Sequence, residues 1–257
     1  MKIAVMGAGK MGSWLAHVLA EGNEVAIYDR TPAKAQAVKG AKALAALSDL
    51  KTFDPQLLIN AVSLQNTIAA FKEATPQLPG GCVICDVASI KTGFEEYYKA
   101  SGFKYASVHP MFGPTFADLD SLREENAVII KGSEPAATGV FRKLFERLGV
   151  HIFEYSFDEH DRMMAYSLTT PFAASLVFAA CMESGTVPGA TFARHRKIAR
   201  GLLSEDDHLL AEILFNPYSI AQLEKITSRL EFLKHVIKGN DYEEAKRFFD
   251  KLRKNVA

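Results

Sequence analysis

Cysteine is scarce in this chain of 257 residues, which has only three. Three cysteines cannot form the disulfide framework of a small secreted domain, so we expect a reducing compartment and a cytoplasmic protein. Cys82 and Cys85 form a C-x-x-C motif, but they lie in an apolar segment typical of a buried strand. Residues three apart on a strand point to opposite faces, so these two thiols cannot bind one metal ion together. We therefore predict buried thiols and no metal site.

An excess of charge is also absent, because 30 Lys and Arg balance 30 Asp and Glu. Without a net positive field, nucleic acid is not expected as the main partner. No signal peptide is seen, since the first apolar run, residues 3–6, is short and leads into a glycine turn. The longest apolar run, residues 171–182, is too short to span a bilayer. We expect neither nucleic acid nor a membrane as partner.

The first 155 residues or so follow a βαβ rhythm, in which apolar runs alternate with helical patterns. Hydrophobic residues make up 48% and charged residues 23%, an ordinary globular composition, and the length suits two modest domains. Strands are predicted at residues 2–6, 24–28, 57–62, 82–87, 105–108, 127–130 and 151–155. The fold class is therefore α/β, with a Rossmann-type parallel sheet over residues 1–156 that binds a dinucleotide.

The rest of the chain, residues 157–257, lacks strand patterns and is predicted to be an all-helical domain for substrate binding and dimerisation. Helices are expected at residues 158–185, with a kink at Pro171, and at 190–203, 206–215, 219–238 and 241–254. Their apolar faces have two explanations. Either a second copy covers them in a homodimer, or they form a self-contained bundle on the first domain.

A G-x-G-x-x-G motif stands between the first predicted strand and the first predicted helix. Such a loop needs glycine for a tight turn, for close approach of the backbone to a pyrophosphate, and for helix–strand packing. The helix N-terminus then offers free amides to the phosphates. The candidate cofactor-binding residues of this loop are Gly7, Ala8, Gly9, Lys10, Met11 and Gly12.

Asp29 follows the second predicted strand, where an acidic residue binds the adenine ribose hydroxyls of NAD. Arg30, with Thr31 and Lys34 beyond it, could instead meet the 2′-phosphate of NADP, so NADP is the alternative to NAD. Ser63 ends the strand predicted at 57–62 and has two explanations. It either lines the cofactor cleft or caps the next helix.

Ser89 and His109 each follow a predicted strand, so both should lie at the carboxyl edge of the sheet beside the nicotinamide. An imidazole has an ordinary pKa near 6.5 and can accept a proton from a substrate hydroxyl near neutral pH. Ser89 could hydrogen-bond the same hydroxyl or orient the imidazole. His109 is therefore the candidate general base and Ser89 its partner.

These segments carry a family resemblance. Residues 86–91, DVASIK, and 109–114, HPMFGP, resemble the paired motifs of prephenate dehydrogenases. Residues 159–161, EHD, followed by MAY at 164–166, resemble the start of that family's helical domain. The likeness runs in order from Gly7 to about Asn216. It implies a Rossmann domain followed by a helical, dimer-forming domain.

The resemblance implies an NAD-dependent oxidoreductase of tyrosine biosynthesis, which decarboxylates prephenate oxidatively to 4-hydroxyphenylpyruvate. His109 would accept the proton of the ring hydroxyl while hydride leaves the same carbon for the nicotinamide, and loss of CO2 gives the aromatic ring. Ser89 would hydrogen-bond that hydroxyl. Lys91 matches a basic position of the motif and is a candidate for substrate contact.

The chain departs from the family pattern at residues 167–172, SLTTPF, where relatives place histidine, arginine or glutamine facing the substrate. The substrate carboxylates then need other cations. Lys225 and Arg229, one turn apart on a later helix, are candidates across a dimer, although an exposed helix face explains them equally well. The choice between prephenate and arogenate stays open. His160 is expected to be structural.

Two rival functions use the same two-domain plan. Another reductase, of the β-hydroxyacid dehydrogenase or imine reductase type, would leave the His109 motif unexplained. A non-catalytic NAD-sensing protein would bind the cofactor without turnover and would not need Ser89 or His109. We also expect no fused chorismate mutase before the first strand and no regulatory domain after the last helix.

Overall fold

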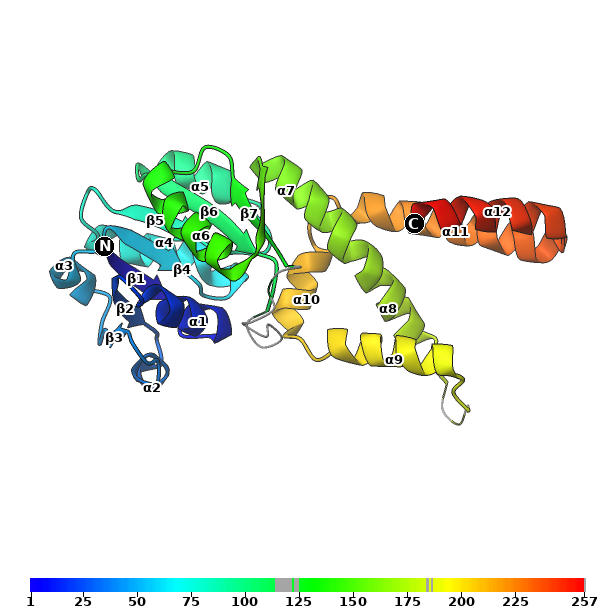
Figure 1. Ribbon diagram of the computed structural model, residues 1–257, viewed down its shortest axis with the longest axis horizontal. Helices are drawn as coiled ribbons and strands as arrows, with labels where there is room; N and C mark the ends of the chain where they lie inside the picture. Colours follow the sequence, from blue (N-terminus) through cyan, green and yellow to red (C-terminus); the bar gives the residue numbers. More distant parts are fainter. Residues whose placement is uncertain (114–121, 123–124, 184, 186, 257) are drawn as a thin grey trace. The chain divides into compact units, whose positions relative to one another are not determined.

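The computed structural model describes residues 1–113, 122, 125–183, 185 and 187–256 (Figure 1). They form two compact units, Met1–Met164 with Glu205–Asn216, and Ala165–Ser204 with Pro217–Ala257. The boundary predicted after residue 156 therefore differs from the observed division. One reason is that Asn216 donates a hydrogen bond from its Nδ2 to the carbonyl oxygen of Asp161 over 2.8 Å, which ties two distant segments together.

An eight-stranded sheet forms the centre of the first unit, in the order β3-β2-β1-β4-β5-β6-β7-β8. Neighbouring strands are parallel except β6 and β7, which are antiparallel. The expected parallel sheet is thus mixed, because β7 and β8 run opposite to the rest. All seven predicted strands are confirmed. The bounds are β1 Lys2–Met6, β2 Glu24–Tyr28, β3 Lys42–Ala43, β4 Leu57–Asn60, β5 Val83–Asp86, β6 Tyr105–Pro110, β7 Asn126–Ile130 and β8 His151–Tyr155.

Helices cover both faces of the sheet, and each face has its own buried apolar core. One core lies under α1 (Lys10–Leu19) and α6 (Pro135–Leu148), and the other under α3 (Asp49–Phe53), α4 (Thr67–Ala74), α5 (Phe94–Ser101) and α7 (Phe157–Met164). The shorter helical elements and α10 complete this unit. They are α2 Pro32–Gln36, η1 Leu64–Asn66, η2 Thr75–Gln77 and α10 Asp207–Leu214.

The two cysteines of the C-x-x-C motif lie on opposite faces of the sheet, as predicted. Cys82 packs in the core beneath α4 and α5, and Cys85 packs in the core beneath α1 and α6. Burial raises the pKa of the Cys82 thiol to about 12 and raises that of Cys85 as well. Both thiols therefore behave as small apolar side chains, with little thiolate for redox or metal chemistry.

The second unit is helical, as predicted. It contains α8 Thr170–Ala180, α9 Ala190–Leu202, α11 Ser219–Gly239 and α12 Tyr242–Asn255. Before α8, residues Ala165–Thr169 form the π-helical turn η4, next to the kink expected at Pro171. The Thr169 hydroxyl lies 2.7 Å from that of Ser219, which joins η4 to the start of α11.

One helix in the described part of the chain, Phe157–Ala180, is long and apolar enough by length and composition to cross a membrane. The apolar run alone, residues 171–182, is too short for a span, but the helix that contains most of it reaches 24 residues. Only 22% of its most apolar stretch is buried. Length therefore does not exclude a membrane span, and most of this apolar surface is uncovered in the isolated chain.

Candidate active site

The three glycines of the G-x-G-x-x-G loop differ in what surrounds them. Gly7 has a φ of +93°, a conformation that favours glycine, and a Cβ there would lie 2.8 Å from the carbonyl oxygen of Ala61. A Cβ on Gly12 would lie 1.9 Å from the carbonyl oxygen of Gly7. A Cβ on Gly9 would meet nothing within 4 Å. The fold thus requires glycine at 7 and 12, whereas the space beside Gly9 is open for a ligand.

The loop leads into α1 with no side-chain cap on its first amides. Gly9 occupies the N-cap position, Lys10 is exposed, and Met11 packs partly against the apolar core. Uncapped amides at a helix N-terminus bind anions through their N–H groups and the positive end of the helix dipole. This part of the structure fits the pyrophosphate of a dinucleotide.

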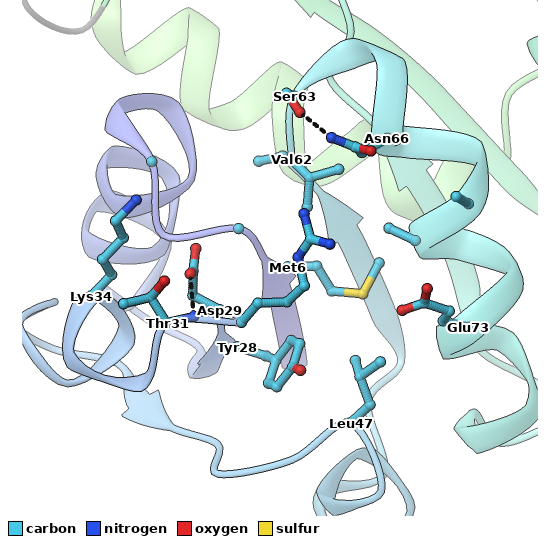
Figure 2. Close-up of a pocket in the computed structure, with 16 residues that line it drawn as sticks. Met6, Tyr28, Asp29, Thr31, Lys34, Leu47, Val62, Ser63, Asn66 and Glu73 are labelled. Carbon is cyan, nitrogen blue, oxygen red and sulfur yellow. Dashed lines mark hydrogen bonds between the residues drawn. The ribbon is translucent and has the colours of Figure 1, made fainter.

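Asp29 lies beside this loop in a pocket of about 400 Å3 (Figure 2). Its Oδ2 accepts a hydrogen bond from the Ala8 amide, and its Oδ1 accepts one from the Thr31 amide, each over 2.8 Å. Both oxygens keep a lone pair for ribose hydroxyls. Arg30 and Lys34 also line the pocket, so basic side chains stand near the carboxylate as predicted.

Ser63 lines the same pocket at the end of β4. It occupies the N-cap position of η1 but makes no side-chain capping bond there. Its Oγ instead accepts a hydrogen bond from Asn66 Nδ2 over 2.8 Å. The structure therefore places Ser63 in the cleft, without the capping bond that was the other explanation.

The candidate residues share one edge of the sheet. Strands β1, β4, β5 and β6 are adjacent and parallel, so their carboxyl ends meet there. Gly7 follows β1, Ser63 and Ser89 follow β4 and β5, and His109 stands near the end of β6. Ligands of open α/β sheets bind at this edge, so the nucleotide loop and His109 are parts of one site. Pro114, the end of the HPMFGP motif, lies outside the described residues.

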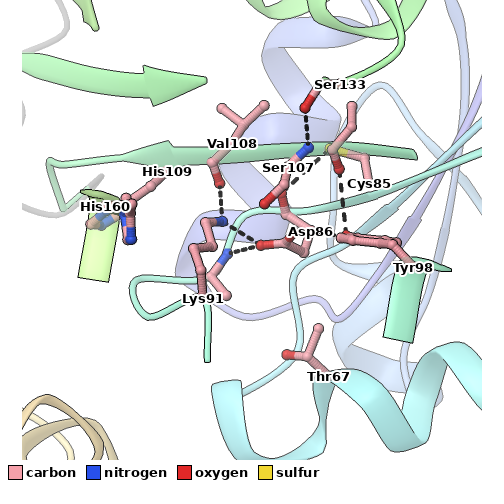
Figure 3. A network of polar contacts seen from close by, with 12 residues as sticks. Thr67, Cys85, Asp86, Lys91, Tyr98, Ser107, Val108, His109, Ser133 and His160 are labelled. Carbon is pink, nitrogen blue, oxygen red and sulfur yellow. Dashed lines mark hydrogen bonds and ion pairs between the residues drawn. The ribbon is translucent and has the colours of Figure 1, made fainter. Parts of the chain in front are cut away.

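His109 is buried, and its ring contacts that of His160 (Figure 3). The distance from His109 Nδ1 to His160 Nε2 is 3.0 Å, and the rings meet edge to face, with their centroids 5.2 Å apart. Burial lowers the pKa of His109 well below its ordinary value, and His160 and the Lys91 ammonium lower it further. His109 is therefore uncharged at neutral pH, as a general base must be.

His160, expected to be structural, contacts the His109 ring, which sequence reasoning did not predict. It is fully buried, and its Nδ1 lies 2.9 Å from Asp161 Oδ1. Burial lowers the pKa of His160, although Asp161 opposes this shift. The same carboxylate accepts hydrogen bonds from the Lys91 amide and the Thr92 hydroxyl, each over 2.7 Å. The adjacent acid and histidine in the EHD segment were the signal that could have revealed this.

Lys91 does not have the exposed position that substrate contact would need. Its ammonium group is completely buried, forms an ion pair with Asp86, and donates a hydrogen bond to the carbonyl oxygen of Val108 over 2.9 Å (Figure 3). Tyr98 also donates to Asp86, over 2.7 Å. The structure therefore contradicts the predicted contact of Lys91 with the substrate. Asp86, two residues after Ile84 on β5, turns the basic side chain into the interior, because a buried carboxylate needs a partner.

The remaining candidates are Ser89, Lys225 and Arg229. Ser89 is half-buried on the loop after β5, and no hydrogen bond between described residues joins it to His109. Lys225 and Arg229 are exposed on α11 in the second unit, where Lys225 Nζ lies 3.4 Å from Gln222 Oε1. Their contact with substrate stays a prediction.

The described residues contain no group of three or more His, Cys, Asp and Glu side chains that could hold a metal ion. His109 supplies a buried imidazole for proton transfer, on the sheet edge that carries the nucleotide loop.

The sequence of the chain resembles prephenate dehydrogenases. A family model, the nucleotide-binding domain of prephenate dehydrogenase, matches residues 16–154. The "Probable arogenate/prephenate dehydrogenase" of Methanocaldococcus jannaschii is 24% identical over 203 residues. The match includes 73% of this chain but only 45% of that protein, so the chain spans less than half the length of this curated relative.

Two solved structures share the fold over nearly the whole chain. Arogenate dehydrogenase from Synechocystis has a TM-score of 0.79 at 21% identity, with 99% of this chain and 98% of that chain covered. Prephenate dehydrogenase from Aquifex aeolicus, in complex with hydroxyphenyl propionate and NAD+, has a TM-score of 0.83 at 16% identity, with 99% and 96% covered. The glycine loop, the buried histidine and the family match agree. The chain belongs to the prephenate dehydrogenase family, and its first domain is that family's nucleotide-binding domain.

Proposed function

We propose that the protein is an NAD-dependent prephenate dehydrogenase, which converts prephenate to 4-hydroxyphenylpyruvate and CO2 in tyrosine biosynthesis. The observation that carries this proposal is the buried His109 imidazole, whose pKa is lowered by burial, on the sheet edge that bears the nucleotide loop. A non-catalytic NAD sensor would not need this group. In a reductase of the imine reductase type, His109 would have no catalytic role.

His109 would act through proton transfer. One ring nitrogen accepts the proton of the substrate's ring hydroxyl, and the electrons of the O–H bond form the developing carbonyl. NAD, when bound, would supply the hydride acceptor for the same carbon. The carbonyl is conjugated to the carbon that bears the ring carboxylate, so the electrons of the C–CO2 bond enter the ring as CO2 leaves. Ser89 would hydrogen-bond the same hydroxyl.

NAD is favoured over NADP because Asp29 would repel a 2′-phosphate. Its two oxygens are already oriented by the Ala8 and Thr31 amides, which presents the carboxylate to the pocket. Arg30 and Lys34 are exposed in the same pocket and support NADP as the alternative.

Arogenate is the second candidate substrate. The name of the Synechocystis relative supports it, and the name of the Methanocaldococcus jannaschii relative includes both substrates. It differs from prephenate by an amino group in place of the side-chain keto group, far from the reacting hydroxyl. Lys225 and Arg229 remain the proposed cations for the substrate carboxylates, reached across a dimer.

The test is formation of reduced cofactor, followed by absorbance, for each of prephenate and arogenate with each of NAD and NADP. Turnover of prephenate with NAD supports the proposal, and turnover with arogenate alone changes the substrate but keeps the reaction. No turnover in any of the four combinations, with NAD binding demonstrated, would contradict it and favour the sensor or another reductase.

We further propose a cytoplasmic homodimer that uses the second unit as its interface. Support comes from the apolar side chains that α11 leaves exposed, among them Ile220 at 65%, Leu230 at 50% and Ile237 at 69%. Monomeric soluble proteins rarely expose so large an apolar surface, and a second copy would cover it without a membrane. The free cysteines support the reducing compartment.

A further inference from the structure

The two nitrogens of the His109 ring are not equivalent. Nδ1 lies 3.0 Å from His160 Nε2, whereas none of the hydrogen bonds between described residues engages Nε2 of His109. In a neutral imidazole one nitrogen carries the proton and the other accepts. A base must present its unprotonated nitrogen to the substrate, so the tautomer of His109 decides whether it can react.

We propose that His160 and Asp161 are positioning residues that hold His109 as the tautomer protonated at Nδ1, which leaves Nε2 as the base. The inference deepens the proposed function and rests on it for the role of His109. The tautomer itself is a property of the free protein and can be measured without substrate.

The direction of each hydrogen bond to Asp161 is fixed, because a carboxylate can only accept. A backbone amide can only donate, so Asp161 Oδ1 accepts from the Lys91 amide. Thr92 Oγ1 lies 2.7 Å from Oδ2, and His160 Nδ1 lies 2.9 Å from Oδ1. A carboxylate accepts all three bonds, and the Nδ1 proton of His160 is then fixed toward it.

The next step follows from the neutral state of the two rings. If His160 carries its proton on Nδ1, its Nε2 has only a lone pair and must accept from His109 Nδ1. His109 therefore carries its proton on Nδ1. Each hydrogen bond in the series fixes the next, from a carboxylate on α7 to the ring on β6.

The same hydrogen bonds stabilise the imidazolium that forms when His109 accepts a proton. The resulting imidazolium donates through Nδ1 to His160, whose Nδ1–H is held by the Asp161 carboxylate. The Lys91 ammonium opposes a positive charge on His109, and its ion pair with Asp86 reduces that opposition. Proton acceptance is thus favoured by a carboxylate that never touches the substrate.

The first test is nitrogen-15 NMR of the histidine side chains in the free protein at about pH 7, with His109 assigned by its loss in His109→Asn. The expected signals show a protonated Nδ1 and an unprotonated Nε2 on His109. His160→Leu, which cannot accept the bond, should convert His109 wholly or partly to the other tautomer. His109 protonated at Nε2 in the wild type, or an unchanged tautomer in His160→Leu, would overturn the proposal.

The second test is steady-state turnover with whichever substrate the wild type uses. His160→Leu should lower kcat about a hundredfold, with KM and NAD affinity within about threefold of wild type. His160→Gln should recover at least tenfold, because its amide oxygen can accept the same bond. The control His151→Gln, on an exposed strand residue, should match the wild type. Equal activity of the Leu and Gln variants, or a change confined to KM, would refute positioning.

These two tests distinguish a failure of the proposed function from a failure of the positioning role of His160 and Asp161. Absence of turnover in the wild type would contradict the proposed function, whereas the NMR result would still decide the tautomer. The expected NMR result with an active His160→Leu variant would overturn the catalytic part of the inference and leave the dehydrogenase intact.

Discussion

Gly9 and Gly12 are three residues apart in one loop, yet they are glycine for different reasons. Gly12 has no room for a side chain, whereas Gly9 faces open space and has a β-type φ of −75° that alanine tolerates. The fold therefore requires glycine at position 12, whereas glycine at position 9 lets the ligand approach the backbone.

This contrast gives a paired prediction. Gly9→Ala should leave the free energy of unfolding within about 0.5 kcal/mol of wild type and weaken NAD binding at least about tenfold. Gly12→Ala should lower the free energy of unfolding by about 1–3 kcal/mol, because a Cβ would collide with the Gly7 carbonyl. Denaturant unfolding and calorimetric titration of NAD measure both. Wild-type NAD affinity in a folded Gly9→Ala would show that the cofactor does not approach this point.

Asp29 should set the cofactor preference. Asp29→Ser removes the negative charge and leaves Arg30 and Lys34 in the pocket, so NAD affinity should fall about tenfold while NADP affinity rises. Titration of both cofactors against the variant measures this. The exposed control Asp250→Ser, on α12, should leave the ratio of the two affinities unchanged. An unaltered ratio in Asp29→Ser would place the ribose elsewhere.

At the scale of elements, the segment between β5 and α5 is fixed from both sides. The Lys91 ammonium is buried against Asp86, while its amide and the Thr92 hydroxyl bind Asp161 of α7. Lys91→Met would leave the Asp86 carboxylate buried without a counter-ion. Removing one partner of a buried ion pair costs about 3–5 kcal/mol, so we expect a loss of that order in unfolding free energy.

The matched control is the exposed pair of Lys99 and Glu95 on α5, whose side chains are 73% and 44% exposed. Lys99→Met should leave the denaturation midpoint almost unchanged, since exposed pairs contribute little. Equal effects of the two methionine variants would show that the buried pair is not a fixed part of this segment.

The elements themselves were largely predictable from local pattern. The seven expected strands are apolar runs between polar segments, and a run such as 2–6 cannot be mistaken when a glycine turn follows it. Strand β3 was missed because its two residues are exposed and carry no apolar pattern. The reversed direction of β7 was not predictable, since strand direction depends on pairing between distant segments and the same apolar pattern suits both directions.

The site was predictable only where a motif marked it. The glycine loop, Asp29 and His109 stand at strand ends, and their spacing alone places them at one edge. The contacts of His109 with His160 and of the Lys91 amide with Asp161 are long-range instead. Asp161 is 70 residues from Lys91, and His160 is 51 residues from His109, separations at which no local pattern reports a contact.

At the scale of the whole molecule, the two buried histidines should make stability depend on pH. Burial lowers the pKa of His109 and of His160 in the folded state, so the unfolded chain, with ordinary values near 6.5, takes up protons first as the pH falls. The stability is complete above about pH 6.5 and declines below it. We expect a loss of about 1–2 kcal/mol in unfolding free energy between about pH 7 and 5.5.

Urea unfolding at the two pH values measures this loss. His160→Gln should reduce the slope of unfolding free energy against pH by the contribution of about one proton. The exposed-histidine control His151→Gln should leave this slope as in wild type. A pH dependence equally steep in wild type and His160→Gln would contradict a neutral, buried His160.

Assembly is the other property of the whole molecule. Ile237→Glu, on the exposed apolar side of α11, should convert the proposed dimer to a monomer, because a charge in an apolar interface is costly. Light scattering coupled to size-exclusion chromatography measures the mass. The neighbouring Lys238→Glu also introduces a carboxylate on this helix but removes no apolar group, and it should remain dimeric. A monomeric wild type would contradict the interface.

The central claim, that His109 is the base of a dehydrogenase, is tested most directly by the rate of cofactor reduction in wild type and His109→Asn at saturating NAD and substrate. His109→Asn should lose about a hundredfold or more in kcat, with NAD affinity unchanged. An active wild type whose His109→Asn variant keeps more than about a tenth of the rate would contradict it, because the reaction would then have another base.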